Sequence, residues 1–97
     1  MSTLHVLSHS PFTDSRLDSC LRLLGDDDGI LLCGDATYAL MPTSAVLARL
    51  QASTESLYAL DEDLLARNIV LPTGAVSVDY AGFVALSIRF DKVNTWL

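Results

Sequence analysis

The sequence predicts an α/β fold with three layers, in which a mostly parallel sheet of four or five strands carries helices on both faces. Short apolar runs alternate with segments whose apolar residues recur at helical spacing, which is typical of such a sheet. The run at residues 30–33 is apolar throughout, as expected of a strand covered on both sides. With 97 residues the chain has room for one core, so we expect a single domain over residues 1–97.

The strands are predicted from these apolar runs and from the turn residues between them. Pro11 and its small polar neighbours indicate a loop after the first strand, because proline cannot donate a ladder hydrogen bond. The acidic run at residues 26–28, followed by Gly29, indicates a turn before the second strand. The expected strands are residues 3–8, 30–33, 56–60 and 75–78, with a short last strand or a docked tail at residues 93–97.

The helices are predicted from capping residues that precede apolar residues at helical spacing. Thr13 or Asp14 is the expected N-cap of the first helix, and Gly25 marks its end. Asp61 and Asp79 are the expected N-caps of the last two helices, so the acidic residues 61–63 are interpreted as stabilising a helix start. The expected helices are residues 13 or 14 to about 24, 34 to about 40, a segment from 42 or 43 that includes 50, 61 to 67, and 79 to about 90.

Composition and charge exclude several classes of function. The net charge is −6, the pI is near 4.4 and the six Lys and Arg residues are scattered, so direct nucleic-acid binding is not expected. The five glycines match neither GxGxxG nor a P-loop, and we expect no cofactor and no metal. Because 51% of the residues are hydrophobic, a domain this small is expected to cover part of its apolar surface by oligomerisation.

The N-terminus and the cysteines indicate a compartment. The first twelve residues lack the basic start of a signal peptide, and no stretch approaches the roughly 20 apolar residues that a membrane helix needs. The two cysteines, Cys20 and Cys33, show neither CxxC nor metal-site spacing, which fits a reducing cytoplasm. We therefore expect a soluble, cytoplasmic protein that does not contact a membrane.

Cys20 is the first candidate for chemistry. A persulfide relay needs a thiolate, and a helix N-terminus or the nearby Arg16 would lower the pKa of this thiol. Cys20 also falls on the apolar stripe formed by Leu17, Leu21 and Leu24, where a cysteine packs as a small hydrophobic residue. The residues alone leave both interpretations open.

Cys33 and the two histidines are weaker candidates. Cys33 ends a strand, where ligands of α/β sheets bind, or it is an ordinary packed residue. His5 and His9, with neighbouring serines and Asp35, contain the residue types of a nucleophilic triad. Such triads are defined by geometry, and the sequence has no GxSxG elbow, so a hydrolase is not expected.

The predicted last helix, residues 79–90, is apolar around more than one stripe. Tyr80, Phe83 and Val84 lie on one side of it, and other apolar residues lie elsewhere on its circumference. A helix that packs only against its own sheet needs one stripe, so the pattern favours a subunit interface. Trp96 is expected to anchor the same contact, because tryptophan is enriched at the centres of interfaces.

Three stretches spread over the whole chain carry a resemblance. They are Leu4-His5 through Ser10-Pro11-Phe12, Tyr58-Ala59-Leu60 through Ala66-Arg67, and Asp79-Tyr80 with Phe83-Val84 and Trp96. In order and spacing they resemble the TusB/DsrH family of sulfur-relay subunits, part of the wider DsrE/DsrF/DsrH-like group. The resemblance implies one DsrH/TusB-like domain with a flavodoxin-like fold. Where other members often have glycine, this chain has Asn68, which tolerates the same left-handed backbone.

The resemblance also implies a function. Members assemble as hetero-hexamers with TusC/DsrF-like and TusD/DsrE-like subunits, receive persulfide sulfur from TusA and pass it to TusE. The sulfur becomes the 2-thio group of the wobble uridine in certain tRNAs. The principal active cysteine lies in the TusD/DsrE-type subunit, so this chain is expected to be mainly structural, and whether it is itself catalytic is left open. DsrH-type members carry a cysteine in the first helix, which makes Cys20 a candidate persulfide carrier.

Two alternatives to this function are kept. The first is a DsrH-type subunit of a DsrEFH complex in dissimilatory sulfur oxidation, which neighbouring genes would distinguish. The second is a homo-oligomeric interaction module without sulfur chemistry, which would assemble from this chain alone.

Overall fold

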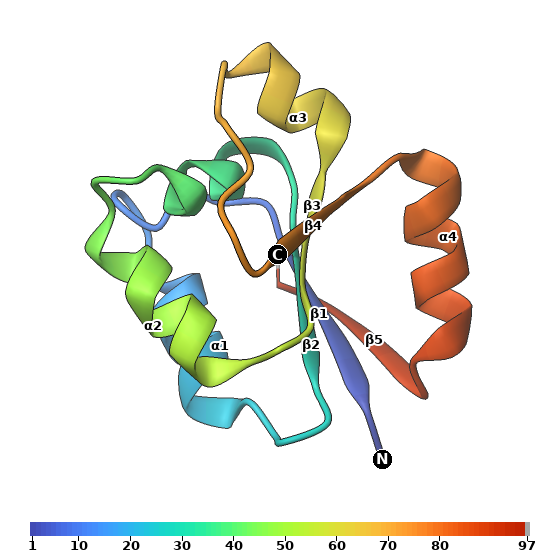
Figure 1. The fold of residues 1–97 in the computed structure, drawn as a ribbon. Coiled ribbons are helices and arrows are strands. Elements are labelled where there is room, and N and C mark those ends of the chain that lie inside the picture. The colour runs from blue at the N-terminus through green and yellow to red at the C-terminus, as the bar shows by residue number, and fades with distance from the viewer. Residues whose placement is uncertain (97) are drawn as a thin grey trace.

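The protein is built on one parallel sheet, which the computed structural model describes over residues 1–96 (Figure 1). Its five strands lie in the order β4-β3-β2-β1-β5, so β4 and β5 form the two edges. The strands are β1 (Thr3–Leu7), β2 (Gly29–Leu32), β3 (Leu57–Leu60), β4 (Ala75–Val78) and β5 (Lys92–Trp96). The predicted strands are confirmed, and residues 92–96 form a strand rather than a docked tail. Leu97, the last residue of that prediction, lies outside the described residues.

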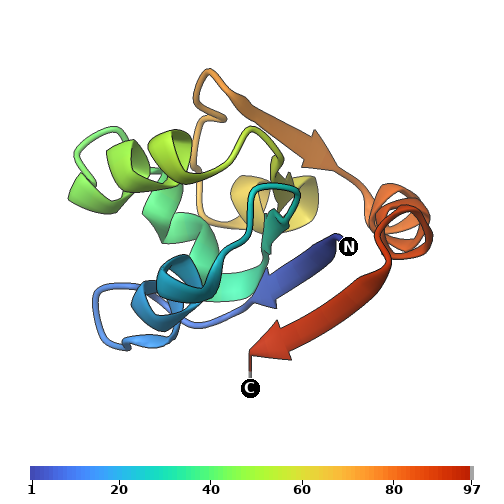
Figure 2. The same ribbon diagram turned by 90° about the horizontal axis from the view of Figure 1, so that it is seen from below.

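Helices cover both faces of the sheet, which confirms the predicted three-layer α/β fold. Figure 2 shows α1 and α2 on one side of the strands and α4 on the other. The elements are α1 (Arg16–Leu23), the 3₁₀ helix η1 (Gly34–Leu40), α2 (Ala45–Ser53), α3 (Asp61–Ala66) and α4 (Tyr80–Arg89). Within residues 1–96, α4 is the one helix whose buried side chains pack on its face of the sheet.

The order of the strands reverses between β1 and β5. The chain runs outward from β1 through β2 and β3 to β4, and then returns to the other side of β1 to form β5. Every neighbouring pair is parallel, as expected when helices or long connections join the strands. The strand order 4-3-2-1-5 differs from the flavodoxin order, 2-1-3-4-5. Both orders reverse next to β1, but here the strand on the other side of the reversal is β5.

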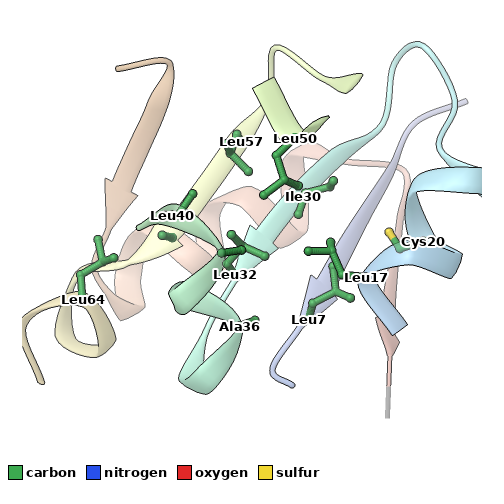
Figure 3. Packing of buried hydrophobic residues seen from close by; sticks show 12 residues of the cluster. Leu7, Leu17, Cys20, Ile30, Leu32, Ala36, Leu40, Leu50, Leu57 and Leu64 are labelled. Carbon is green, nitrogen blue, oxygen red and sulfur yellow. The ribbon is translucent and has the colours of Figure 1, made fainter. Parts of the chain in front are cut away.

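The larger core lies between the sheet and the helices α1, η1, α2 and α3 (Figure 3). Leucines point into it from strands and helices alike, and Ile30, Leu50 and Leu57 are at most 1% exposed. Truncating a buried leucine or isoleucine to alanine costs about 2–5 kcal/mol, so this cluster supplies much of the stability. Its members include Leu7, Leu17, Cys20, Ile30, Leu32, Ala36, Leu40, Leu50, Leu57 and Leu64.

The smaller core lies between the sheet and α4. Leu4 and Val6 of β1 and Leu31 of β2 meet Leu86 and Phe90 from α4 and its end. All four residues of β2 are buried, because both of its faces are covered. The apolar run that predicted this strand therefore reflects two cores rather than one.

The helix starts show where local sequence signals were sufficient. Asp79 caps α4 as predicted, since its side chain accepts a hydrogen bond from the N–H of Gly82 at 2.7 Å. The prediction for α3 was wrong by one position, because β3 leads directly into the helix and Asp61 is its first residue, after an N-cap at Leu60. The left-handed conformation expected at Asn68 is confirmed by its φ of 55°.

The first and third helical segments also differ in detail. The helix α1 begins at Arg16 with Ser15 as its N-cap, so neither Thr13 nor Asp14 holds the predicted position. Asp14 nevertheless accepts a hydrogen bond from the N–H of Arg16 at 2.8 Å, and so satisfies one of the free donors of the first turn. The start of α2 lies slightly later than predicted, with Ser44 as the cap.

Candidate functional site

The carboxyl ends of the strands form the edge where ligands of open α/β sheets bind, beside the reversal of strand order. In this protein the reversal lies between β1 and β5, next to the loop that begins with Ser8 and His9 and next to Trp96. Cys33 and Gly34 follow β2 at the same edge, and Asp61 follows β3. The candidate residues are therefore distributed along one edge, and their burial decides what they can do.

Cys20 lies in the interior and away from this edge. It is 0% exposed and packs among the leucines of the larger core (Figure 3). Burial, and then the negative charge of Asp28, raise the pKa of the Cys20 thiol to about 12. The thiol is therefore protonated at neutral pH, and this geometry favours the packing interpretation of Cys20 over the reactive one.

Cys33 lies at the carboxyl edge and is half-buried. Its thiol donates to the carbonyl oxygen of Leu7 at 3.4 Å, and its backbone N–H donates to the same oxygen at 2.9 Å. Burial and the carboxylate of Asp63 raise the pKa of Cys33, and the charge of Arg67 partly opposes them. Cys33 packs against the α4 side of the sheet whereas Cys20 packs on the other side, so the two thiols are separate and free.

Asp35 and Asp63, two of the acidic residues near this edge, make contacts within the fold. Asp63 accepts from the N–H of Gly34 at 2.7 Å, and the guanidinium of Arg67 donates to Asp35 Oδ1 through Nε at 3.1 Å and Nη2 at 3.0 Å. Arg67 also lies over the ring of Tyr38, 5.8 Å from its centre. These contacts fasten α3 to η1. Across the described residues 1–96, no three His, Cys, Asp or Glu side chains are grouped so that they could hold a metal ion.

A buried polar network that the sequence analysis missed connects three distant positions. Trp96 Nε1 lies 3.1 Å from His5 Nδ1, and His5 Nε2 lies 3.2 Å from Asp28 Oδ2. Asp28 also accepts from the backbone N–H groups of Thr3 and Gly25, each at 2.9 Å. His5 is 5% exposed and takes part in this network rather than in a nucleophilic triad. Its partners depend on strand register, which no local motif signals.

The exposed apolar surface of α4 shares Tyr80 and Val84 with the predicted interface and differs from it in its other members. Tyr80, Val84 and Ile88 recur every four residues and are 69%, 43% and 79% exposed. Val76 and Val93 are exposed on the same face of the sheet, since their register partners Tyr58 and Leu4 belong to the smaller core. We call these five residues the α4 surface. The spacing of Ile88 from Tyr80 and Val84 could have identified it in the sequence.

Phe83 and Trp96, the other interface candidates, lie elsewhere. Phe83 packs against the smaller core, and its ring meets the ring of Tyr80 edge-on, with the two ring centres 6.2 Å apart. Trp96 is paired in register with Leu7, so it lies on the α1 side of the sheet and packs on the larger core. The structure therefore does not place Trp96 on one contact surface with α4.

No helix within residues 1–96 is long and apolar enough to span a membrane.

Comparisons with solved structures define the class of protein. The fold matches the crystal structure of the ychN protein from E. coli with a TM-score of 0.79 at 19% identity, over 99% of this chain and 100% of that one. It also matches a protein of unknown function, MTH1491 from Methanobacterium thermoautotrophicum, with a TM-score of 0.57 at 13% identity over 96% of each chain. At these identities the matches show a shared small three-layer α/β fold.

Comparisons of sequence define the family. The family model described as DsrH like protein matches residues 9–93, and the chain belongs to this family. It is 34% identical to Protein TusB of Yersinia pestis (strain Pestoides F) and 33% identical to Protein TusB of Escherichia coli O81 (strain ED1a). Each match covers 96% of this chain and 99% of the relative. The resemblance to the TusB/DsrH family of sulfur-relay subunits is thereby confirmed.

Proposed function

We propose that this chain is a mainly structural subunit of a cytoplasmic sulfur-relay complex that supplies the sulfur of 2-thiouridine at the tRNA wobble position. The observation that carries the proposal is the similarity to TusB proteins over nearly the whole chain. The acidic charge of −6 supports a role among proteins, with other components binding the tRNA.

The state of the two thiols supports the structural part of the proposal. A persulfide relay proceeds by attack of a thiolate on sulfur, and burial raises the pKa of both Cys20 and Cys33. Neither thiol is therefore activated in the isolated chain. The principal reactive cysteine belongs, in this proposal, to a TusD/DsrE-like partner.

The α4 surface is the proposed contact with the other subunits. Its five apolar side chains lie on the face that a single helix covers, and Ile88 and Tyr80 are the most exposed of them. The proposed assembly is a hetero-hexamer with TusC/DsrF-like and TusD/DsrE-like subunits, which accepts sulfur from a TusA-like donor and passes it to a TusE-like acceptor. Trp96 and Phe83 contribute to this assembly through the fold rather than by direct contact.

Cys20 as a persulfide carrier is the second form of the proposal. Its thiolate would attack the outer sulfur of the donor persulfide, form a new S–S bond and release the donor thiolate. Because Cys20 is 0% exposed, this step requires the complex to move α1 away from the sheet. The position of Cys20 in the first helix, as in DsrH-type members, is the observation that favours keeping it.

The test measures 2-thiouridine in tRNA hydrolysates by mass spectrometry. Cells that lack the gene are complemented with the wild-type chain, with Cys20→Ala or with Cys33→Ala as the matched control, and the complex is followed by native mass spectrometry. Full 2-thiouridine with Cys20→Ala supports the structural subunit. Loss of 2-thiouridine with an intact complex identifies Cys20 as a carrier.

Two results would replace the proposal. Deletion of the gene without any loss of 2-thiouridine, together with neighbouring genes for sulfite reductase components, would favour the DsrH-type role in sulfur oxidation. A stable assembly of this chain alone, without other small subunits, would favour the homo-oligomeric interaction module.

A further inference from the structure

The end of β5 is fastened to the sheet by a side-chain hydrogen bond as well as by its ladder. Trp96, in the last described position, lies beside His5 of the neighbouring strand, with their ring centres 6.1 Å apart and their planes inclined at 39°. The indole nitrogen of Trp96 and the Nδ1 atom of His5 are 3.1 Å apart. On the far side of the imidazole, Nε2 is 3.2 Å from the carboxylate of Asp28.

The donors and acceptors that Trp96, His5 and Asp28 offer determine which nitrogen of His5 carries a proton. An indole nitrogen can only donate, so Nδ1 of His5 must accept and carries no proton. A neutral imidazole then has its proton on Nε2, which donates to the acceptor Asp28. Neutral His5 thus satisfies both of its neighbours.

Protonation of His5 would affect the two neighbours in opposite ways. The imidazolium donates from both nitrogens, so Nδ1–H would face the N–H of Trp96 and their hydrogen bond would be lost. The contact with Asp28 would become a charge-assisted hydrogen bond and would persist. We infer that His5 is a proton-sensitive clasp that holds the end of β5 while its imidazole is neutral and releases it on protonation.

The surroundings of His5 are consistent with a local switch. Asp28, from the turn before β2, is the titratable group in contact with His5, and the charge of Asp28 also acts on the buried thiol of Cys20 from α1. Asp18 of α1 pairs instead with an arginine of α2. The charge of β5, on Lys92, is exposed and lies at the opposite end of the strand.

Loss of the hydrogen bond between Trp96 and His5 would loosen the edge of the sheet that β5 forms. Among the described strands β5 pairs with β1 alone, and Trp96 is its last residue, next to the reversal of strand order. Without the indole hydrogen bond the end of β5 is held by its backbone hydrogen bonds and by the packing of Trp96 on the larger core, so it would open more often than it does with that bond in place. This inference concerns the fold and stands whether or not the proposed sulfur-relay function is correct.

The chain contains one tryptophan and two histidines, which makes the test direct. The ring protons of His5 and His9 and the indole N–H of Trp96 are followed by NMR as the pH is lowered. We expect the indole resonance to shift with the midpoint of His5. Amide exchange of residues 94–96, corrected for its intrinsic pH dependence, should accelerate about fivefold, the factor for loss of one hydrogen bond.

Two variants complete the test. His9→Gln, which removes the exposed histidine of the β1–α1 loop, should leave the titration of the indole unchanged. His5→Asn keeps a hydrogen-bond acceptor but cannot be protonated, so it should abolish the pH-dependent shift of the indole resonance. The inference is overturned if His5 titrates while the indole resonance and the exchange of β5 stay constant. It is also overturned if His5 stays neutral until the whole protein unfolds.

Discussion

The carbonyl oxygen of Leu7 accepts two hydrogen bonds from Cys33, one from its backbone N–H at 2.9 Å and one from its thiol at 3.4 Å. This arrangement ties the ends of β1 and β2 together at the edge of the sheet where a ligand would bind. It also occupies the thiol, whose pKa is raised by burial. Cys33 is partly exposed but not activated, whereas Cys20 is neither exposed nor activated.

This difference predicts the order in which the thiols react. With a disulfide reagent at pH 8, we expect the native chain to react slowly at Cys33 and not at Cys20, because Cys20 is 0% exposed with a thiol pKa of about 12. Both should react at once in denaturant. Cys33→Ser is the control and should leave no reactive thiol in the native chain. Modification of Cys20 at the rate of Cys33 would contradict the described packing.

The packing around Gly29 leaves no room for a side chain at the start of β2. A Cβ added there would lie 2.6 Å from Cζ of Phe90 and 3.2 Å from the carbonyl oxygen of Ser56. We expect Gly29→Ala to lower the free energy of unfolding by about 1–3 kcal/mol, the usual cost of overpacking, as measured in urea. Combining it with Phe90→Leu, which shortens the clashing side chain, should recover part of the loss. If the losses of unfolding free energy in the two single variants simply add in the double variant, the strain comes from the backbone contact and not from Phe90.

Asp28 predicts a loss of stability in acid. Burial opposes its ionisation, but hydrogen bonds from the N–H groups of Gly25 and Thr3 and the contact with His5 outweigh it, so the pKa of Asp28 is lowered from 3.8. A carboxyl whose pKa is lower in the folded state stabilises the fold above its unfolded pKa, and this contribution is lost as the pH falls through the folded value.

The corresponding measurement is the urea midpoint between pH 6 and pH 2. Asp28→Asn should be less stable than the wild type at pH 6, and the two should converge as the pH falls below 3.8. Asp27→Asn, at the exposed neighbouring position, is the matched control and should follow the wild type. A constant difference between Asp28→Asn and the wild type over this range would show that the carboxylate charge is not involved.

The α4 surface predicts a variant that separates assembly from folding. Ile88 is 79% exposed, so we expect Ile88→Asp to change the free energy of unfolding by no more than about 0.5 kcal/mol, as is usual for surface substitutions. The charge should nevertheless prevent an apolar interface from forming, and native mass spectrometry should show loss of the partner subunits. Leu65→Asp is a close control, because Leu65 is also 79% exposed but lies on α3. Equal loss of assembly in both variants would rule out the α4 surface as the specific contact.

The sequence was sufficient where structure depends on neighbours in the chain. Apolar runs identified the strands, and Asp79 was recognised as a cap because its partner, Gly82, is three residues away. The N-cap of α1 was misplaced because several acidic or hydroxyl residues adjoin its start. The N-cap of α3 was misplaced because β3 leads directly into the helix, so that the cap is Leu60 and the acidic residues lie in the first turn. Asp14 shows that a residue can satisfy the helix start without being its cap.

The sequence was insufficient where position depends on register. Trp96 and the α4 helix were assigned to one surface, but alternation along β5 turns Trp96 to the opposite face, beside Leu7. The partners of His5 lie 23 and 91 residues away, so no local pattern joins them. The apolar stripe allowed Cys20 to be either buried or reactive, and its burial could be seen only once α1 was packed on the sheet.

The two edges of the sheet differ in how well they resist pairing with another chain. The edge strand β5 begins with Lys92, and charged residues of this kind discourage edge-to-edge aggregation. The other edge, β4, consists of Ala75, Val76, Ser77 and Val78 and carries no charge, with Val76 54% exposed. Its four-residue length limits the contact, but in concentrated solution β4 is the edge at which strands of separate molecules would add to one another. A preparation that precipitates on storage should therefore be rescued by a lysine in place of Val76 sooner than by any change to β5.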